Sequence, residues 1–143
     1  RRIVEEGISL YDVFKIASAY DSICAEWVNN YPITFDIGYP FFKRQIEKTN
    51  DVNLATVNTF LKILAEVPDT LIVRKAGKKK ALEVSLEAKR ILELGGLETE
   101  AGMKELIEFD YRLRHSGNSL NPGTTADIVS AVLALNILEG FRP

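Results

Sequence analysis

Hydrophobic residues recur every three or four positions along most of this 143-residue chain, a spacing typical of amphipathic helices. The pattern predicts helices over residues 9–29 and 41–48, a third capped by Asp51, a short one ending near Gly77, a long one ended by Gly95 and Gly96, and one capped by Thr99. Residues 71–73 would also suit a strand, but no second strand candidate exists to pair with them. We therefore expect an all-α fold, a compact bundle of about six helices in one domain over residues 1–143.

The stretch Asn121–Leu138 joins a polar loop to an apolar run. Pro122 and Gly123 stop the preceding helix, and Thr124 with Asp127 has the spacing of a capping box. The residues after Asp127 are almost all apolar, so this helix lacks the polar face of a surface helix and is expected to be central and buried. Its N-terminus could bind phosphate, or the capping box could only begin the helix.

Two polar residues fall inside predicted apolar faces. Asn58 lies within the apolar stripe of the third predicted helix, where a buried amide needs a hydrogen-bond partner. Asp110 shares an arc with Met103, Ile107 and Leu113 of the helix capped by Thr99. An acid on an apolar face is a candidate for chemistry.

Composition excludes several classes of protein. The formal net charge of −2 gives no basic face for nucleic acid, and the apolar runs are too short to span a bilayer. Cys24 is the only cysteine, which excludes an internal disulfide and a Cys-rich zinc site and fits a reducing cytoplasmic compartment. The chain opens on Arg1 rather than methionine, within a helix-like stretch, so we expect a fragment of a longer protein.

Four acids lie on apolar helical faces or at helix starts, and their side chains could converge: Asp21, Asp69, Asp110 and Asp127. Burying several carboxylates costs several kcal/mol per ion unless a cation or donors compensate, and carboxylates with few other ligands suit Mg²⁺. The alternative is that Asp69 and Asp127 cap helices, while Asp21 and Asp110 pair with Arg74 or with backbone and hydroxyl donors. Glu26 is placed on the side of the first helix opposite its apolar face.

Arg74 lies five residues after Asp69 and suits bidentate contact with phosphate. The lysines at 78–80 favour a solvated helix start. His115 is the only histidine, so a histidine-based metal site is not expected. The sequence has no Walker loop, dinucleotide fingerprint or nucleophile elbow.

Several of these segments together resemble the triphosphoribosyl-dephospho-coenzyme A synthase family. They are Asn121-Pro122-Gly123-Thr124-Thr125-Ala126-Asp127 preceded by Asp110, the upstream segment Asp69-Thr70-Leu71-Ile72-Val73-Arg74-Lys75-Ala76-Gly77, and Tyr20-Asp21-Ser22-Ile23 with Glu26-Trp27. The resemblance covers nearly the whole chain but only the C-terminal half of that family, and first-half motifs such as Pro-Lys-Pro-Gly are absent. Ala76 departs from the family's expected Arg-Gly-Gly.

The resemblance implies an all-α enzyme that transfers the triphosphoribosyl group of ATP to the ribose 2′-hydroxyl of dephospho-coenzyme A, or of a related acceptor, and releases adenine. The product would be a prosthetic-group precursor for acyl carrier proteins. An N-terminal half or a second copy of the chain could complete the protein. Two other readings stay open: a non-catalytic helical domain that binds a nucleotide or a protein, and an enzyme of the same fold with another phosphorylated substrate.

Site roles follow from the resemblance and from glycosidic chemistry, in which a carboxylate stabilises an oxocarbenium-like ribose. Asp110 and Asp127 are the predicted catalytic acids, and with Asp21 they are the predicted Mg²⁺ ligands. The predicted substrate-binding residues are Asp69, Arg74, Asn121, Gly123, Thr124 and Thr125. The residue that acts as catalytic base is not assigned.

Overall fold

The computed structural model describes residue 7 and residues 9–142, and over these residues it is all-α. The elements are α2 (Leu10–Ala17), α3 (Ser22–Val28), η1 (Ile33–Gly38), α4 (Tyr39–Thr49), α5 (Val52–Glu66), α6 (Thr70–Ala76), α7 (Lys78–Glu93), η2 (Gly96–Glu98), α8 (Glu100–Arg114) and α9 (Gly123–Leu138). The all-α prediction is confirmed, and the strand alternative for residues 71–73 is wrong because they lie in α6. None of the helices in the described part is long and apolar enough to cross a membrane.

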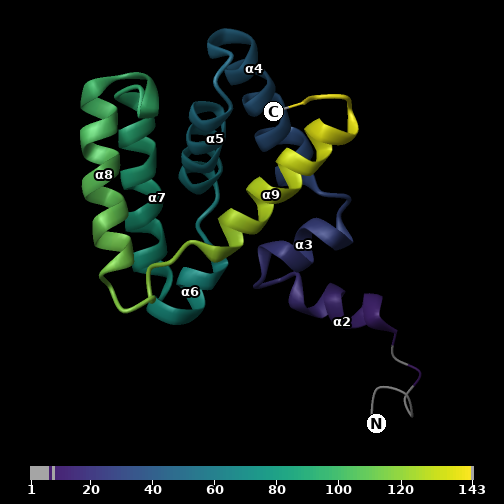
Figure 1. The fold of residues 1–143 in the computed structure, drawn as a ribbon. Coiled ribbons are helices and arrows are strands. Elements are labelled where there is room, and N and C mark those ends of the chain that lie inside the picture. Colours follow the sequence, from purple (N-terminus) through teal and green to yellow (C-terminus); the bar gives the residue numbers. More distant parts are fainter. Residues whose placement is uncertain (1–6, 8, 143) are drawn as a thin grey trace.

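The helices are arranged around α5, which packs against α7, α4 and α9. Figure 1 shows α7 and α8 paired on one side of α5, with α9 crossing on its other side and α2 and α3 beyond it. The core has two clusters, one between α5, α7 and α8 and one between α4, α5 and α9, and Phe60 of α5 packs against both. The central helix of the bundle is therefore α5.

The predicted first helix over residues 9–29 is two helices. Ser9 and Asp12 form a capping box at the start of α2, which ends at Ala17. Asp21 then begins α3, because its side chain accepts hydrogen bonds from the backbone N–H groups of Ile23 and Cys24. The continuous apolar spacing concealed this break, since a new cap can restart a helix without disturbing the periodicity.

The predicted connection before α4 contains the π-helix η1, which is held by a buried carboxylate. Glu26 is 2% exposed and accepts hydrogen bonds from the backbone N–H groups of Ile33 (2.7 Å) and Thr34 (3.0 Å) and from the Thr34 hydroxyl (2.8 Å). The placement of Glu26 on the solvent side of its helix is therefore wrong. These hydrogen bonds compensate for the cost of burying the charge.

The position of η1 brings Gly38 against α9. A Cβ atom on Gly38 would lie 2.4 Å from Cγ2 of Val132 and 3.1 Å from Cδ1 of Ile63. Only glycine therefore permits this close approach of the two helices.

The predicted capping box of α9 is wrong. The residue before its first turn is Pro122, no side chain of its own caps it, and Thr124 lies inside the helix. One face of α9 is buried, while the other exposes Asp127, Ser130 and Leu138, the last of them to 85%. The expectation of a fully buried helix thus holds for one face only.

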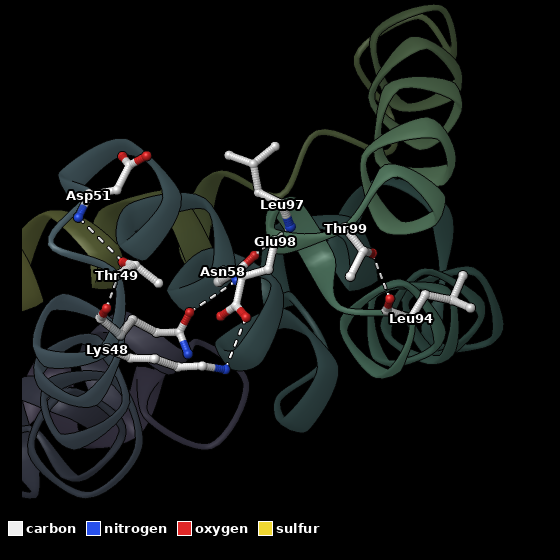
Figure 2. Close-up of polar contacts among 9 residues, drawn as sticks. Lys48, Thr49, Asp51, Asn58, Leu94, Leu97, Glu98 and Thr99 are labelled. Atoms are coloured by element: carbon white, nitrogen blue, oxygen red, sulfur yellow. Dashed lines mark hydrogen bonds and ion pairs between the residues drawn. The ribbon is translucent and has the colours of Figure 1, made fainter.

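Asn58 on α5 has the partners that its burial requires. Its Nδ2 donates to Oε1 of Gln45 on α4 (3.0 Å), and its Oδ1 accepts from the backbone N–H of Leu97 in η2 (2.9 Å). Figure 2 shows Asn58 between these two segments, near the ion pair of Lys48 and Glu98. The prediction that this amide needs partners is confirmed.

Candidate functional site

Asp69 joins the first turns of α6 and α9. Its Oδ1 accepts from the backbone N–H groups of Leu71 (2.9 Å) and Ile72 (3.2 Å), which caps α6 as predicted. Its Oδ2 accepts from the backbone N–H (2.7 Å) and the hydroxyl (2.8 Å) of Thr125. The carboxylate is 1% exposed and has four donors, so a single buried anion lies at two helix N-termini, where the helix dipoles favour it.

Thr70 extends this connection to a third helix. Its hydroxyl oxygen accepts from the backbone N–H of Ser22 in α3 (3.2 Å) and lies 3.2 Å from the hydroxyl of Thr124. The starts of α3, α6 and α9 therefore meet around Asp69 and Thr70. Thr70 was not among the predicted site residues, because its partners on other helices leave no periodic signal in the sequence.

The first turn of α9 offers fewer free donors than the sequence suggested. The backbone N–H of Gly123 donates to the carbonyl of Asn121, and both donors of Thr125 bind Asp69. The sequence predicted a phosphate at this helix N-terminus. In the structure the carboxylate of Asp69 binds there instead. Phosphate contacts from Gly123, Thr124 and Thr125 stay a prediction.

Gly123 also permits close packing at this point. A Cβ atom on Gly123 would lie 2.6 Å from Cδ2 of Leu71, so a larger residue here would require the Leu71 side chain to shift. The glycine thus leaves room for the Leu71 side chain beside the start of α9.

Asp21 and Arg74 both lie near Cys24, between α3 and α6. The pKa of the Cys24 thiol is raised, mainly by burial and then by the negative charge of Asp21, while the positive charge of Arg74 acts in the opposite direction. Asp21 is half-buried and Arg74 is exposed. Arg74 lies in the last turn of α6, and an exposed guanidinium at this position suits contact with an anionic substrate.

Asp110 lies on the exposed side of α8, so the predicted apolar stripe of that helix is partly wrong. The buried residues of α8 are Gly102, Phe109 and Leu113, whereas Ile107 is 63% exposed. Asp110 accepts a hydrogen bond from Nε of Arg114 (2.9 Å), and both side chains are more than half exposed. The two residues lie one helical turn apart and are solvated, so their ion pair adds little to the stability of the fold.

An open groove of about 880 Å³ lies beside Asp110. It runs between α5 and α8 to the start of α9, and it is lined by Thr56, Val57, Phe60, Leu61, Leu106, Ile107, Phe109, Asp110, Leu113, Arg114, Asn118, Asn121, Pro122 and Ala126. Of the predicted site residues, Asp110 and Asn121 line this groove, whereas Asp69, Thr124 and Thr125 are buried at the meeting point of the helices.

The three predicted metal ligands do not form a cluster. Asp21 begins α3, Asp110 lies on α8, and Asp127 is exposed on α9. Within the described residues no three His, Cys, Asp or Glu side chains lie close enough together to hold a metal ion. The predicted three-carboxylate site for Mg²⁺ is therefore absent from this arrangement.

The chain matches a protein-family model over nearly its whole length. The family model for CitG, described as ATP:dephospho-CoA triphosphoribosyl transferase, matches residues 1–142. The chain belongs to this family. The predicted resemblance is confirmed.

Two curated relatives show how this transferase family member compares in length. The 2-(5''-triphosphoribosyl)-3'-dephosphocoenzyme-A synthase of Klebsiella pneumoniae is 36% identical over 99 residues, which cover 68% of this chain and 32% of the relative. The protein of the same name from Escherichia fergusonii is 30% identical over 100 residues, which cover 70% of this chain and 32% of the relative. The chain spans about a third of the length of these curated relatives.

A solved structure supports the fold of this transferase family member. A crystal structure from Archaeoglobus fulgidus, named for a triphosphoribosyl-dephospho-coA synthase, has a TM-score of 0.78 and 28% identity to this chain. The match covers 99% of this chain and 57% of that one. The all-α architecture is thus shared across the described helices.

Proposed function

We propose that this chain carries the transfer site of an ATP:dephospho-CoA triphosphoribosyl transferase. In this reaction the triphosphoribosyl group of ATP moves to the ribose 2′-hydroxyl of dephospho-coenzyme A, adenine leaves, and the product is a prosthetic-group precursor. ATP and dephospho-coenzyme A, or a related acceptor, are the proposed substrates.

One observation carries the proposal in addition to family membership. The segments that resemble the family, residues 69–77 and 121–127, are joined by the hydrogen bonds from Thr125 to Asp69, 56 positions apart. Buried groups hold this junction, while Arg74 in the last turn of α6 and Asp127 in the first turns of α9 are exposed. An internally satisfied scaffold that presents exposed charged groups is the arrangement expected of a preorganised site.

In the proposed reaction the acceptor hydroxyl attacks C1 of the ATP ribose as the bond from C1 to the adenine nitrogen breaks. Positive charge develops at C1, and a nearby carboxylate stabilises it. We assign this role to Asp127, because it is exposed on the first turns of α9, close to Gly123 and Thr125. Adenine leaves with a proton, and the acceptor hydroxyl gives its proton to a base that is not assigned.

The remaining roles are proposals of the same kind. Arg74 would contact the triphosphate, and Asp69 would act by positioning the start of α9 rather than by touching substrate. Asn121, Gly123 and Thr124 would contact phosphate or ribose, and Asp110 would act at the neighbouring groove. Asp21, Asp110 and Asp127 do not fit one Mg²⁺ site, so any Mg²⁺ would bind chiefly through the phosphates of ATP. A cytoplasmic location, where both substrates occur, is part of the proposal.

Adenine release from ATP in the presence of dephospho-coenzyme A tests the proposal. Asp127→Asn should lower the rate at least about 100-fold, in the range of a lost general acid, base or charge stabiliser, with unchanged helical content. Asp36→Asn on η1 is the matched control, because Asp36 is also an exposed acid but lies outside the junction. Equal turnover of the two variants would reject a functional role for Asp127.

A non-catalytic domain that binds a nucleotide or a protein is the second candidate. The observation that favours it is the internal use of Asp69 and Thr125, which leaves them no free group for a substrate. Binding of ATP and dephospho-coenzyme A by the folded chain without adenine release would support this candidate over the transferase.

A further inference from the structure

The proposed reaction assigns no ligand to the groove between α5 and α8. Both helices pack on α7, and the groove lies between them. Its far end is formed by Asn121, Pro122 and Ala126, so it opens directly onto the first turn of α9. Its volume of about 880 Å³ is in the range of small-molecule sites.

The walls of the groove are mainly apolar. Leu61, Phe109 and Leu113 form buried parts of the lining, and Phe60 is partly buried. Ile107 stands at the edge and is 63% exposed. Apolar surface in such a concavity favours a ligand that carries uncharged, largely apolar groups.

The polar groups of the groove are few and carry little net charge. Arg114 is paired with Asp110, so the one cation in the lining is already neutralised. Asn118 and Asn121 contribute two side-chain amides to the lining, and both residues are exposed. Exposed amides suit amide or hydroxyl groups of a ligand, whereas a triphosphate requires several cations.

The two proposed substrates differ in the charge of the group that could enter the groove. ATP ends in a triphosphate, whereas dephospho-coenzyme A ends in a long uncharged pantetheine arm with two amide groups. The groove matches the arm and not the triphosphate. An arm lying in the groove would also bring the rest of the acceptor to the start of α9, where transfer is proposed.

We propose that the groove lined by α5, α8 and the start of α9 binds the uncharged pantetheine arm of the acceptor. The inference rests on the proposed function for the identity of the acceptor. It goes beyond that function by separating the acceptor site from the site of the ATP phosphates.

The test is isothermal titration of the chain with dephospho-coenzyme A, followed by competition with pantetheine and with ATP. Pantetheine should displace dephospho-coenzyme A, and ATP should not. Ile107→Glu places a charge in the groove and should weaken dephospho-coenzyme A at least about tenfold, the effect of about 1.4 kcal/mol of lost binding energy. Leu86→Glu on α7 is the matched control, because Leu86 is 60% exposed and does not line the groove.

Circular dichroism verifies that both variants fold, which is expected because both side chains are exposed. Equal affinity of Ile107→Glu and Leu86→Glu for dephospho-coenzyme A would overturn the inference. Displacement by ATP but not by pantetheine, or no binding of dephospho-coenzyme A by the folded chain, would also overturn it.

The same variants separate this inference from the proposed function. Adenine release that is insensitive to Ile107→Glu at limiting acceptor would reject the groove and retain the transferase. Groove-dependent binding of dephospho-coenzyme A without adenine release would retain the groove and reject the transferase.

Discussion

Asp69 is the residue through which two distant segments of the sequence become one structural unit. Its two carboxylate oxygens cap α6 and hold the first turn of α9 through Thr125. Both oxygens act only as acceptors, so the protein requires a carboxylate rather than any polar residue of similar size.

Asp69→Asn replaces one accepting oxygen by an NH₂ group that faces donors. The free energy of unfolding should fall by about 3 kcal/mol, because buried donors lose a charged partner. Urea denaturation followed by circular dichroism measures the change. Asp110→Asn is the control, since loss of its exposed ion pair should cost less than about 0.5 kcal/mol. A similar small loss for both variants would contradict the structural role of Asp69.

Cys24 reports on the charges around the start of α3. Burial and the charge of Asp21 raise the pKa of its thiol, so at pH 8 less thiolate is present than for an exposed cysteine. Alkylation by iodoacetamide should therefore be slower than for a model thiol. Asp21→Asn removes the charge that raises the pKa and should speed alkylation. Arg74→Gln removes the charge that lowers the pKa and should slow alkylation.

Rates of Cys24 alkylation measured from pH 7 to pH 10 provide the check. The two substitutions should move the pH at half-maximal rate in opposite directions. Movement in one direction for both would show that Asp21 and Arg74 do not act on this thiol.

At the residue scale, the sequence predicted correctly those side chains that form hydrogen bonds within their own helix. Asp51, Asp69 and Thr99 were predicted as caps, and each accepts a hydrogen bond from its own first turn. It failed for Glu26, whose partners Ile33 and Thr34 lie beyond the end of α3. No local pattern indicates such a partner.

At the scale of the elements, the start of α9 illustrates the same limit. Thr124 and Asp127 have the spacing of a capping box, yet the accepting group for this helix comes from Asp69 on another helix. The end of the first helix was also missed. Here the apolar spacing continues through the break before Asp21, so the periodicity did not indicate that a new helix begins. Periodicity identified most helices, but a local cap from Asp21 begins α3, and a contact from Asp69 holds the start of α9.

The contact between η1 and α9 allows a prediction about two elements together. Gly38→Ala would place a methyl group 2.4 Å from Cγ2 of Val132, so overpacking should destabilise the protein by about 1–3 kcal/mol. Val132→Ala alone should also destabilise, because Val132 is fully buried and its loss leaves a cavity.

In the double variant, the new methyl group fills part of the space that Val132 leaves. The cost of Gly38→Ala with Val132→Ala should therefore be smaller than the sum of the single costs by at least about 0.5 kcal/mol. Urea denaturation of the four proteins completes the cycle. Additive costs would contradict direct contact between η1 and α9.

At the scale of the whole molecule, the all-α class followed from periodicity and the absence of a second strand candidate. The order of packing did not follow, because α9 is the most apolar helix in sequence while α5 lies at the centre of the described bundle. The predicted site residues also separate at this scale. Asp110 and Asn121 line the groove, while Asp69, Thr124 and Thr125 form the junction of three helix starts.

This division of the molecule is the basis of the proposed reaction. The junction would hold ATP beside Arg74 and Asp127, and the groove would hold the acceptor. The two sites meet at the first turn of α9, where Pro122 and Ala126 line the groove and Thr125 binds Asp69.

The most direct test of the account is mass spectrometry of dephospho-coenzyme A after incubation with ATP and this chain. The account predicts that dephospho-coenzyme A gains one triphosphoribosyl group and that free adenine appears in equal amount. Unmodified dephospho-coenzyme A and intact ATP after incubation with the folded chain would contradict it.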